Sequence, residues 1–469
     1  MSRERILEEA RARWESLADL RERRNRYKRF TYGRQWDDAI TDPHSGQKVT
    51  ERSLLSKDGR PPLTNNLIRQ LVKTIIGRFR MGRGEAERGA LDRVYVLNEL
   101  DELDSRLLEE FLISSIAVQR VCREVRDDGL FLPRVENVSP ERMFFNVPKD
   151  PRGIDIDIIG TLHDMKPEEV AIRWGGSKRA TARRILFRCQ RLIADNAKRG
   201  VSHWDSITDF YSADGNYVRV VEVWKREAFE QLKVHDPENG TITLMDPSEE
   251  ANIETENILR KRDRRPELTA RWEMVRQWVG RWFLSDGTLL SKMTAPAGVS
   301  HPFIVKLYPL IDGEIHSLVE DVIDQQKYIN RLINLLDRMM ATAAKGALLF
   351  PVDALPEGCE FEDIANQWAA TDGVVIYKSN IGDEAPKQVT TTVGDIGAKD
   401  LLKTEMQLFK EISGVSDTLT GRNLSGSMGV ERYNLELQSA TTSIRDLLES
   451  FSCFLAQRDL RLLQLGCDV

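Results

Sequence analysis

The sequence has few of the residues that metal and redox sites need. Its five cysteines are scattered along 469 residues, are odd in number and never stand in a CxxC pattern. Such thiols are typical of a reduced, intracellular protein rather than of a disulfide framework or a zinc site. The six histidines are widely spaced and offer no ligand pair. We therefore expect no metal and no cofactor. The cysteines are Cys122, Cys189, Cys359, Cys453 and Cys467.

Long apolar runs are also missing. No stretch approaches the roughly 18 apolar residues that a membrane span requires. The N-terminus, MSRERILEEARARW, is charged where a signal peptide would be apolar. We expect a protein that is made in the cytoplasm and has no membrane partner.

A basic excess is absent as well. The chain has 68 basic against 74 acidic residues, a net charge of −6. Proteins that hold duplex DNA by neutralising its phosphates are usually basic, which argues against a general DNA binder. A channel through which DNA slides needs the opposite balance, so the composition permits a conduit without requiring one.

Motifs of the common enzyme classes are lacking. The glycines Gly421 and Gly426 are followed by Ser427 where a Walker A motif has lysine, and HExxH and GxSxG do not occur. The best acidic pair is Asp155 and Asp157, which would share one face of a strand and offer ligands to a divalent metal. Because Pro151 and Gly153 lie nearby, we prefer to interpret the two aspartates as solvated turn residues. The sequence does not predict an enzyme, and a nuclease-like activity stays as an alternative.

Apolar spacing predicts several helices. An amphipathic helix is expected over residues 2–30, where Arg21 to Arg29 would form a salt-bridged face rather than a nucleic-acid contact. A second helix follows a cap at Thr64 or Asn65. The longest are expected from a cap at Asp312 and from Val430, the latter with up to about 36 residues, or roughly 54 Å. Other helices are expected at about 91–117, 166–199, with Pro167 in its first turn and Gly200 as its stop, and 249–265.

Strands are expected between these helices. Their ranges are 120–126, 130–138, 217–229, 241–245, 271–284 and 288–293. Asp286 and Gly287 are a strong hairpin signal between the last two. Tryptophans gather in that hairpin, where a core role is preferred over an exposed docking surface. The fold class is therefore α+β.

Four stretches, in this order, resemble the portal proteins of tailed phages. Together they cover most of the chain. They are Tyr32-Gly33-Arg34-Gln35-Trp36 with Gly59-Arg60-Pro61 and Asn65-Asn66; 138–145 with 165–169, where Asn146 replaces a commoner aspartate; 301–313 with 324–330; and Glu411-Ile412-Ser413-Gly414-Val415 with Gly421-Arg422-Asn423 and Ser425-Gly426.

The resemblance implies a ring of about twelve subunits with wing, stem and clip regions, a conduit for double-stranded DNA at the unique capsid vertex of the virion. Expected partners are further copies of the chain, the DNA, the terminase large subunit, the head-tail adaptor and a capsid or scaffold protein. A scaffold or adaptor protein is the other non-enzymatic alternative. The implied regions are wing 1–245, first stem helix 246–267, clip 268–300, second stem helix 301–345, wing 346–412, tunnel loop 413–429 and a long internal helix 430–469 with the crown short or absent.

Two sets of site residues follow from the resemblance. The tunnel loop is rich in glycine, serine and threonine, and would touch DNA lightly in the channel. The clip hairpin would dock the motor and the adaptor. The tunnel residues are Asp417, Arg422, Asn423, Ser425 and Ser427, and the clip residues are Trp272, Arg276, Trp278, Arg281 and Trp282.

Overall fold

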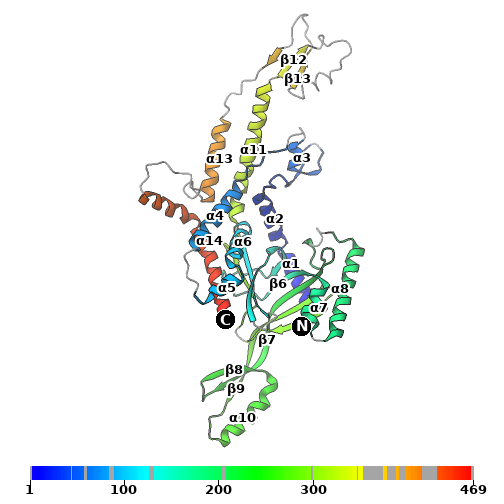
Figure 1. The fold of residues 1–469 in the computed structure, drawn as a ribbon, viewed down its shortest axis with the longest axis vertical. Coiled ribbons are helices and arrows are strands. Elements are labelled where there is room, and N and C mark those ends of the chain that lie inside the picture. Colours follow the sequence, from blue (N-terminus) through cyan, green and yellow to red (C-terminus); the bar gives the residue numbers. More distant parts are fainter. Residues whose placement is uncertain are drawn as a thin grey trace.

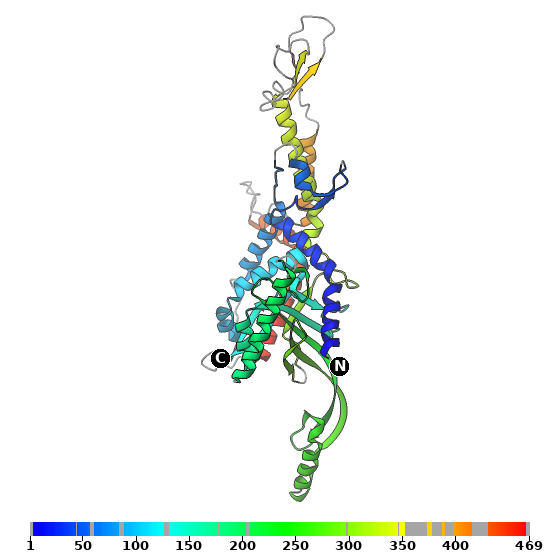
Figure 2. The same cartoon turned by 90° about the vertical axis from the view of Figure 1, so that its right-hand side faces the viewer.

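The chain mixes helices and sheets in an elongated shape, with a central body and an extension at either end (Figure 1). Two long helices lead to a small sheet at one end, and two long strands curve away from the body at the other (Figure 2). The mixture of helix and strand expected from the sequence is confirmed. The computed structural model describes residues 3–465, with gaps at 44, 57–60, 84–88, 126–130, 177, 203–206, 297–298, 346, 352–372, 378–386, 390–396 and 415–429.

The described elements alternate along the chain. The helices are α1 (Arg3–Ser16), α2 (Ala18–Thr31), α3 (Glu51–Leu55), α4 (Leu67–Arg83), α5 (Asp92–Leu97), α6 (Leu100–Ser114), α7 (Pro167–Gly175), α8 (Arg179–Arg199), α10 (Glu250–Arg262), α11 (Leu318–Lys345), α13 (Ala398–Ser413) and α14 (Val430–Gln464). The strands are β1 (Ala39–Thr41), β2 (Lys48–Thr50), β3 (Ile116–Val125), β4 (Phe131–Asn137), β5 (Met143–Phe145), β6 (Ile158–Met165), β7 (Val218–Asp236), β8 (Thr241–Met245), β9 (Thr269–Leu284), β10 (Leu289–Thr294), β11 (Phe303–Leu307), β12 (Ala347–Pro351), β13 (Gly373–Tyr377) and β14 (Lys387–Val389).

The largest sheet has the order β10-β9-β7-β6-β5, with β8 added to the outer end of β7. The strands β7 and β9 pair antiparallel from Val220 and Leu284 to His235 and Thr269. Residues 218–225 of β7 are all buried, whereas its outer half is mostly only partly buried, so β7 extends from the core toward the outer end of the sheet. Gly280 is required on β9 because a Cβ there would lie 2.8 Å from the Trp224 ring.

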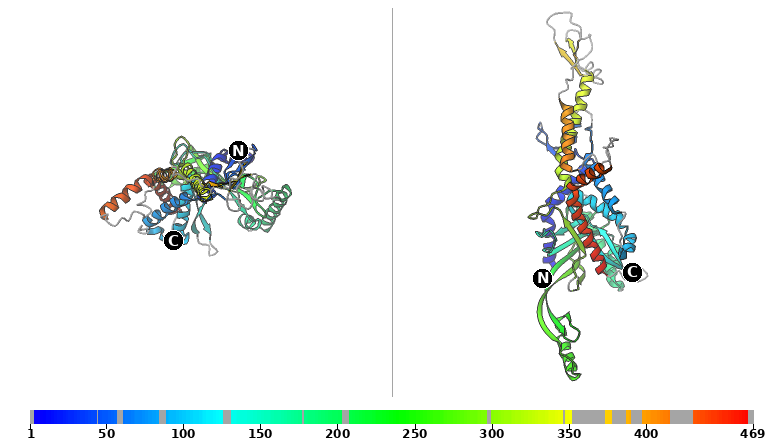
Figure 3. Two further views of the ribbon diagram at one scale, coloured as in Figure 1. Left: turned by 90° about the horizontal axis from the view of Figure 1, so that it is seen from above. Right: turned by 90° about the vertical axis from the view of Figure 1, so that its left-hand side faces the viewer.

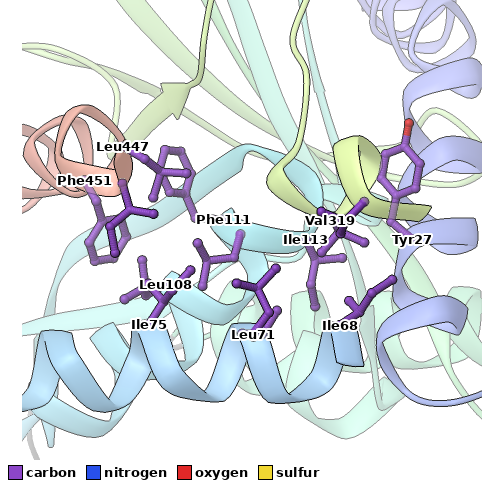
Figure 4. Close-up of a cluster of buried hydrophobic side chains, with 14 of the residues drawn as sticks. Tyr27, Ile68, Leu71, Ile75, Leu108, Phe111, Ile113, Val319, Leu447 and Phe451 are labelled. Atoms are coloured by element: carbon purple, nitrogen blue, oxygen red, sulfur yellow. The ribbon is translucent and has the colours of Figure 1, made fainter. Parts of the chain in front are cut away.

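A second core lies among helices. Apolar faces of α2, α4, α6, α11 and α14 meet in one cluster (Figure 4). Phe111 and Phe451 are fully buried there, with ring centroids 5.5 Å apart. Since α6 enters the cluster and continues into β3, this core fixes the long helices to the smaller sheet β11-β3-β4.

Several predicted elements are confirmed, among them α4, α10, the α14 helix and the hairpin of β9 and β10 at Asp286-Gly287. Three long helices were predicted wrongly, because each is broken by a turn. The first ends at Ser16, where Leu17 leaves helical geometry and the Arg21 guanidinium donates to the Trp14 carbonyl at 2.6 Å. The second breaks at Asn98 and Glu99, and its expected end at Ala117 already belongs to β3.

The third break separates α7 from α8 at two adjacent glycines. Gly176 has φ +58°, and a Cβ on Gly175 would lie 2.7 Å from the Cβ of Ala182. Only glycine permits so close a helical hairpin. Pro167 does begin α7, and Gly200 does end α8 in the left-handed conformation, as expected.

The predicted caps also need correction. Asp312 lies in a turn with φ +53°, and α11 is instead capped by Ser317, whose hydroxyl accepts from the Glu320 N–H at 2.9 Å. The Glu320 carboxylate accepts in return from the Ser317 N–H at 3.3 Å, which completes a capping box. At α4 the cap is Asn66, not Thr64 or Asn65.

A buried carboxylate lies at the centre of the large sheet. Glu222 on β7 is fully buried and lies 3.4 Å from Arg120 and 2.8 Å from His163 Nε2, and it accepts from Trp224 Nε1 at 2.9 Å. Burial alone would raise the pKa of Glu222, but Arg120, His163 and Trp224 outweigh it and lower the pKa to about 2. The ionised form is therefore built into the fold.

We expect Glu222→Gln to destabilise the protein by on the order of 3 kcal/mol near pH 7. Because the folded pKa is depressed, this stabilisation is present above the ordinary pKa of 4.5 and is lost as the pH falls toward about 2. The difference in free energy of unfolding between the two proteins should therefore shrink over that range. Urea denaturation at several pH values tests this. A difference that stays constant would contradict it, and the exposed Glu230→Gln serves as the neutral control.

Candidate functional site

The helices α11 and α13 lie side by side and form the extension that carries the small sheet (Figure 1). The chain leaves the body along α11, forms β12, β13 and β14, and returns along α13. In that sheet β12 lies between β13, which is parallel to it, and β14, which is antiparallel. Among the described elements at this end of the molecule, the strands β12, β13 and β14 lie farthest from the large sheet.

The base of α11 is held by a hydrogen-bonded cluster, which we call the polar clamp: the buried side-chain amides of Gln35, Gln326 and Asn330, the partly buried amide of Asn66, and the backbone of Asn65. Gln326 Oε1 accepts from the Leu67 N–H at 2.9 Å, and its Nε2 donates to the Asn65 carbonyl at 2.6 Å. Gln326 and Asn330 are 0% and 1% exposed. Since the first N–H groups of α4 have no partner within their own helix, α11 supplies one.

Asn330 completes the connection to the segment after α2. Its Oδ1 accepts from the Asn65 N–H at 2.9 Å, and its Nδ2 donates to Gln35 Oε1. Gln35 in turn donates to the Phe30 carbonyl at 2.9 Å, and Asn66 donates to the Thr31 carbonyl at the same distance. The polar clamp thus joins α2, α4 and α11 through buried amides that are nearly all satisfied.

Ion pairs flank the polar clamp. Lys327 donates to Asp38 at 2.8 Å, and Arg26 and Arg29 reach the same carboxylate. Burial alone would raise the pKa of Asp38, but Lys327 and Arg26 outweigh it and hold that pKa below its usual range. One turn further along α11, Arg331 binds Glu51 at 2.7 Å. The orientation of α11 on the body is therefore fixed by amides inside and charges outside.

The last helix has its own polar anchor. Arg458 of α14 is fully buried and donates to Asp104 at 2.5 Å and to Tyr95 at 2.6 Å. Asp104 also accepts from Arg83 of α4 at 2.5 Å. Burial raises the pKa of Tyr95 to about 12, so its hydroxyl stays a donor, to Asp459 at 2.8 Å. Nothing in the motifs of the sequence indicated this cluster.

The expected clip residues are not one exposed surface. Trp278, Arg281 and Trp282 are 5%, 7% and 9% exposed, because the inner half of β9 is a central strand of the large sheet. Arg281 binds Glu227 at 2.8 Å. Trp272 and Arg276 are exposed on the outer half of the same strand. The preference for a core role of the tryptophans is correct for two of the three.

The two expected stem helices do not lie together. The helix α10 packs against the outer ends of β7, β8 and β9, through Ile253 against Leu232 and Val234. The helix α11 extends from the opposite end of the body (Figure 1). The reason is the length of β7 and β9, which carry α10 away from the core.

The remaining predicted site residues are those of the tunnel loop and the acidic pair Asp155 and Asp157. The tunnel residues Asp417, Arg422, Asn423, Ser425 and Ser427 lie outside the described residues. Asp155 accepts from the Lys149 N–H at 2.6 Å, and Asp157 is exposed beside Arg226. In the part of the chain that is described, no three histidine, cysteine or acidic residues gather as a metal site. The pair therefore shows no built site for metal-dependent cleavage.

The basic stretch of α2 is used inside the protomer. Arg24 is 4% exposed and binds Glu110 at 2.6 Å, and Arg26 and Arg29 bind Asp38. The preference for salt bridges over nucleic-acid contact is therefore confirmed for these arginines. Among the described helices, none is long and apolar enough to cross a membrane.

The sequence matches the model of the phage P22-like portal protein family over residues 89–432, which is more than half of the chain. The chain therefore belongs to the phage P22-like portal protein family. No curated protein matches it in sequence.

Membership confirms the resemblance and gives the coarse function. Portal proteins are structural rather than enzymatic, and they form a homo-oligomeric ring at the capsid vertex of a virion, in contact with capsid and terminase. The motifs that carried the resemblance supply Gln35, Asn65, Asn66, Gln326 and Asn330 to the polar clamp. Those motifs are therefore structural: they position the long helix.

We expect Gln326→Leu to destabilise the protein by on the order of 3 kcal/mol, because it removes the acceptor of the buried Ile68 N–H and one hydrogen-bond partner each of the Leu67 N–H and the Asn65 carbonyl. Gln70→Leu, an exposed glutamine on α4, should change stability by less than about 0.5 kcal/mol. Urea denaturation of both variants beside the unmodified protein is the measurement. Equal stability of the two variants would show that the polar clamp does not hold α11.

Proposed function

We propose that about twelve copies of this chain close into a ring at the unique capsid vertex, through which double-stranded DNA is packaged and later released. We also propose that the ring docks the terminase large subunit and the head-tail adaptor. Family membership supports the ring in general, and the shape of the protomer supports its geometry. Each copy in such a ring occupies a wedge of about 30°, which a thin protomer fits.

The protomer has broad faces suited to that packing. Figure 1 is viewed down the shortest axis, and from above the molecule is drawn out in one direction (Figure 3, left). Copies would stack by these broad faces. The two ends of the wider direction in the view from above would then lie at the inner and the outer radius of the ring. A head-to-tail interface of this kind closes into a ring when the rotation is right.

Apolar side chains on the helix pair support contact between copies. Leu335 and Met340 on α11 are 50% and 68% exposed, and Leu408 and Ile412 on α13 are 39% and 44% exposed. Two helices alone cannot cover so many apolar positions, and a neighbouring copy would bury them. This is the observation that carries the proposal.

The arrangement of elements also changes the regional assignment. We propose that α11 and α13 are the two stem helices and that the β12–β14 sheet between them belongs to the clip. The support is that α11 and α13 bracket a small β unit at the end of the molecule, whereas α10 and α11 extend in opposite directions. Motor and adaptor would then dock at β12–β14, and residues 268–300 would belong to the wing.

Ring assembly can be tested on the helix pair. Leu335→Glu combined with Leu408→Glu should prevent rings, because two charges would be buried between copies. The fold of the protomer should survive, since both side chains are substantially exposed in it. Mass photometry reports the assembly, and circular dichroism reports the fold. Ile258→Glu, on exposed α10, is the matched control. Rings of normal mass from the double variant would contradict this interface.

The tunnel assignment rests on the sequence and on the position of its neighbours. The segment 415–429 joins α13 to α14, so it follows directly from a proposed stem helix. Twelve copies at −6 would carry about −72, and an acidic wall would let DNA slide without sticking. Asp417 and Arg422 are the full charges between Val415 and Gly429, so contact would be light.

Arg422→Glu should weaken DNA retention or change the packaging rate while rings still assemble, because one phosphate-facing charge per copy is reversed. Packaging of DNA into capsids, with protection from nuclease as the readout, measures the effect. Arg13→Glu reverses an exposed charge on α1 and is the control. Unchanged packaging and retention with Arg422→Glu would remove this residue from the channel.

A further inference from the structure

The helix α8 carries the densest positive charge among the described helices that is not neutralised within the protomer. Its 21 residues include seven basic side chains and one acidic one, a balance of 7 − 1 = +6 in a chain whose net charge is −6. The rest of the chain therefore carries −12. Ile185 and Cys189 form the buried side of α8, and the basic side chains lie around the remainder.

Most of these cations have no carboxylate partner. Arg188 binds Asp286 at 2.5 Å, while Arg191 and Lys198 approach the single Asp195 at only 4.0 and 3.8 Å. In the described part of the chain, no acidic group lies within ion-pair distance of the remaining four, all of which are exposed: Arg179, Arg183, Arg184 and Arg199.

The contrast with α2 shows that a lack of carboxylate partners is not a general property of the basic helices. On α2, Arg23, Arg24, Arg26 and Arg29 all bind aspartate or glutamate within the protomer. Replacing Arg24, Arg26 or Arg29 would remove an ion-pair partner from the partly buried carboxylates of Glu110 and Asp38. Four of the seven cations of α8 have no such partner, and their concentration on one helix indicates a partner outside the protomer.

We propose that the exposed face of α8 binds the phosphate backbone of duplex DNA without sequence preference, at a surface separate from the channel. The face extends for about 30 Å along the helix, which matches a run of backbone phosphates better than a single point charge. Cations spread along and around a helix, rather than gathered in a pocket, suit a polyanion that can lie across them in several registers.

The position of α8 separates it from the conduit. Seen down the longest axis of the molecule, α8 and the beginning of α14 lie at opposite ends of the wider direction of that view (Figure 3, left). This step rests on the proposed function: if the segment before α14 lines the channel, α8 lies on the outer rim of the ring. DNA bound there would be DNA that surrounds the ring rather than DNA that passes through it.

A phenylalanine on the same face makes it possible to distinguish DNA from a protein partner by experiment. Phe187 is 71% exposed among these arginines, and aromatic residues with arginine are enriched in protein interfaces. A phenyl ring adds nothing to phosphate binding. Phe187 therefore separates the two classes of partner in an experiment, because an acidic polypeptide would use it and a duplex would not.

The test uses the purified, assembled protein and a labelled, relaxed, closed circular duplex, which cannot thread through a closed ring. Binding is measured over a series of salt concentrations. Arg183→Gln, Arg184→Gln and Arg191→Gln together should weaken binding roughly tenfold or more at 0.1 M salt and reduce the slope of log K against log salt by about 2 to 3. The control removes three exposed cations from the far end of the protomer: Lys261→Gln, Arg262→Gln and Arg264→Gln.

The outcomes separate clearly. Support requires that the α8 variant loses binding and salt dependence while the control and Phe187→Ser stay within about twofold of the unmodified protein. The proposal is overturned if the α8 variant binds normally, if the control loses as much, or if Phe187→Ser is equally defective, which would indicate an acidic protein partner. Mass photometry of the same samples reports ring assembly. Absent rings would therefore count against the proposed function, whereas the comparison of variants decides the role of α8.

Discussion

A buried amide that lacks a hydrogen-bond partner costs on the order of 1–3 kcal/mol, and the orientation of α11 depends on avoiding that cost. Gln326 and Asn330 project from one side of α11 into the body, where they meet backbone groups at Asn65 and Leu67. Apolar contacts alone would tolerate small rotations of a long helix, because they are not directional. Amide hydrogen bonds do not, so the polar clamp sets where the far end of α11 points.

This constraint matters more as the helix becomes longer. The helix α11 has 28 residues, or about 42 Å of length, and a small angular error at its base becomes a large displacement at β12. In the ring that we propose the requirement would be stricter, since every copy would have to present its helix pair at the same angle for the interface to close. Buried charge on the other side of the core, at Arg458 and Asp104, holds α14 to the same body in a similar way. The protomer thus secures each long helix with directional polar contacts where it meets the core.

The sequence predicted elements whose signals are local. Asp286-Gly287 gave the hairpin, Gly200 gave the end of α8, and the apolar stripe from Val430 gave α14 within about a residue of its length. Errors arose where several residues offered a local signal: the capping box begins at Ser317, five residues after Asp312, which we had expected to be the cap. The polar clamp could not be predicted from the sequence for another reason. Its members lie up to 295 positions apart in the chain, and nothing local in Gln35 indicates that Asn330 is its partner.

The exposure of individual side chains was the other property that could not be predicted from the sequence. Trp272 and Trp278 lie on the same strand, six residues apart, and an alternating pattern places them on one face of it. One is 49% exposed and the other 5%, because β9 passes from the core to the outer extension between them. The same reasoning applies to charge. Arg24, Arg219 and Arg458 are buried and paired, so they stabilise the fold and contribute little to the field outside. A net charge of −6 therefore does not describe the charge of any one surface, because the external field is set by which charges the fold leaves exposed and by where they lie.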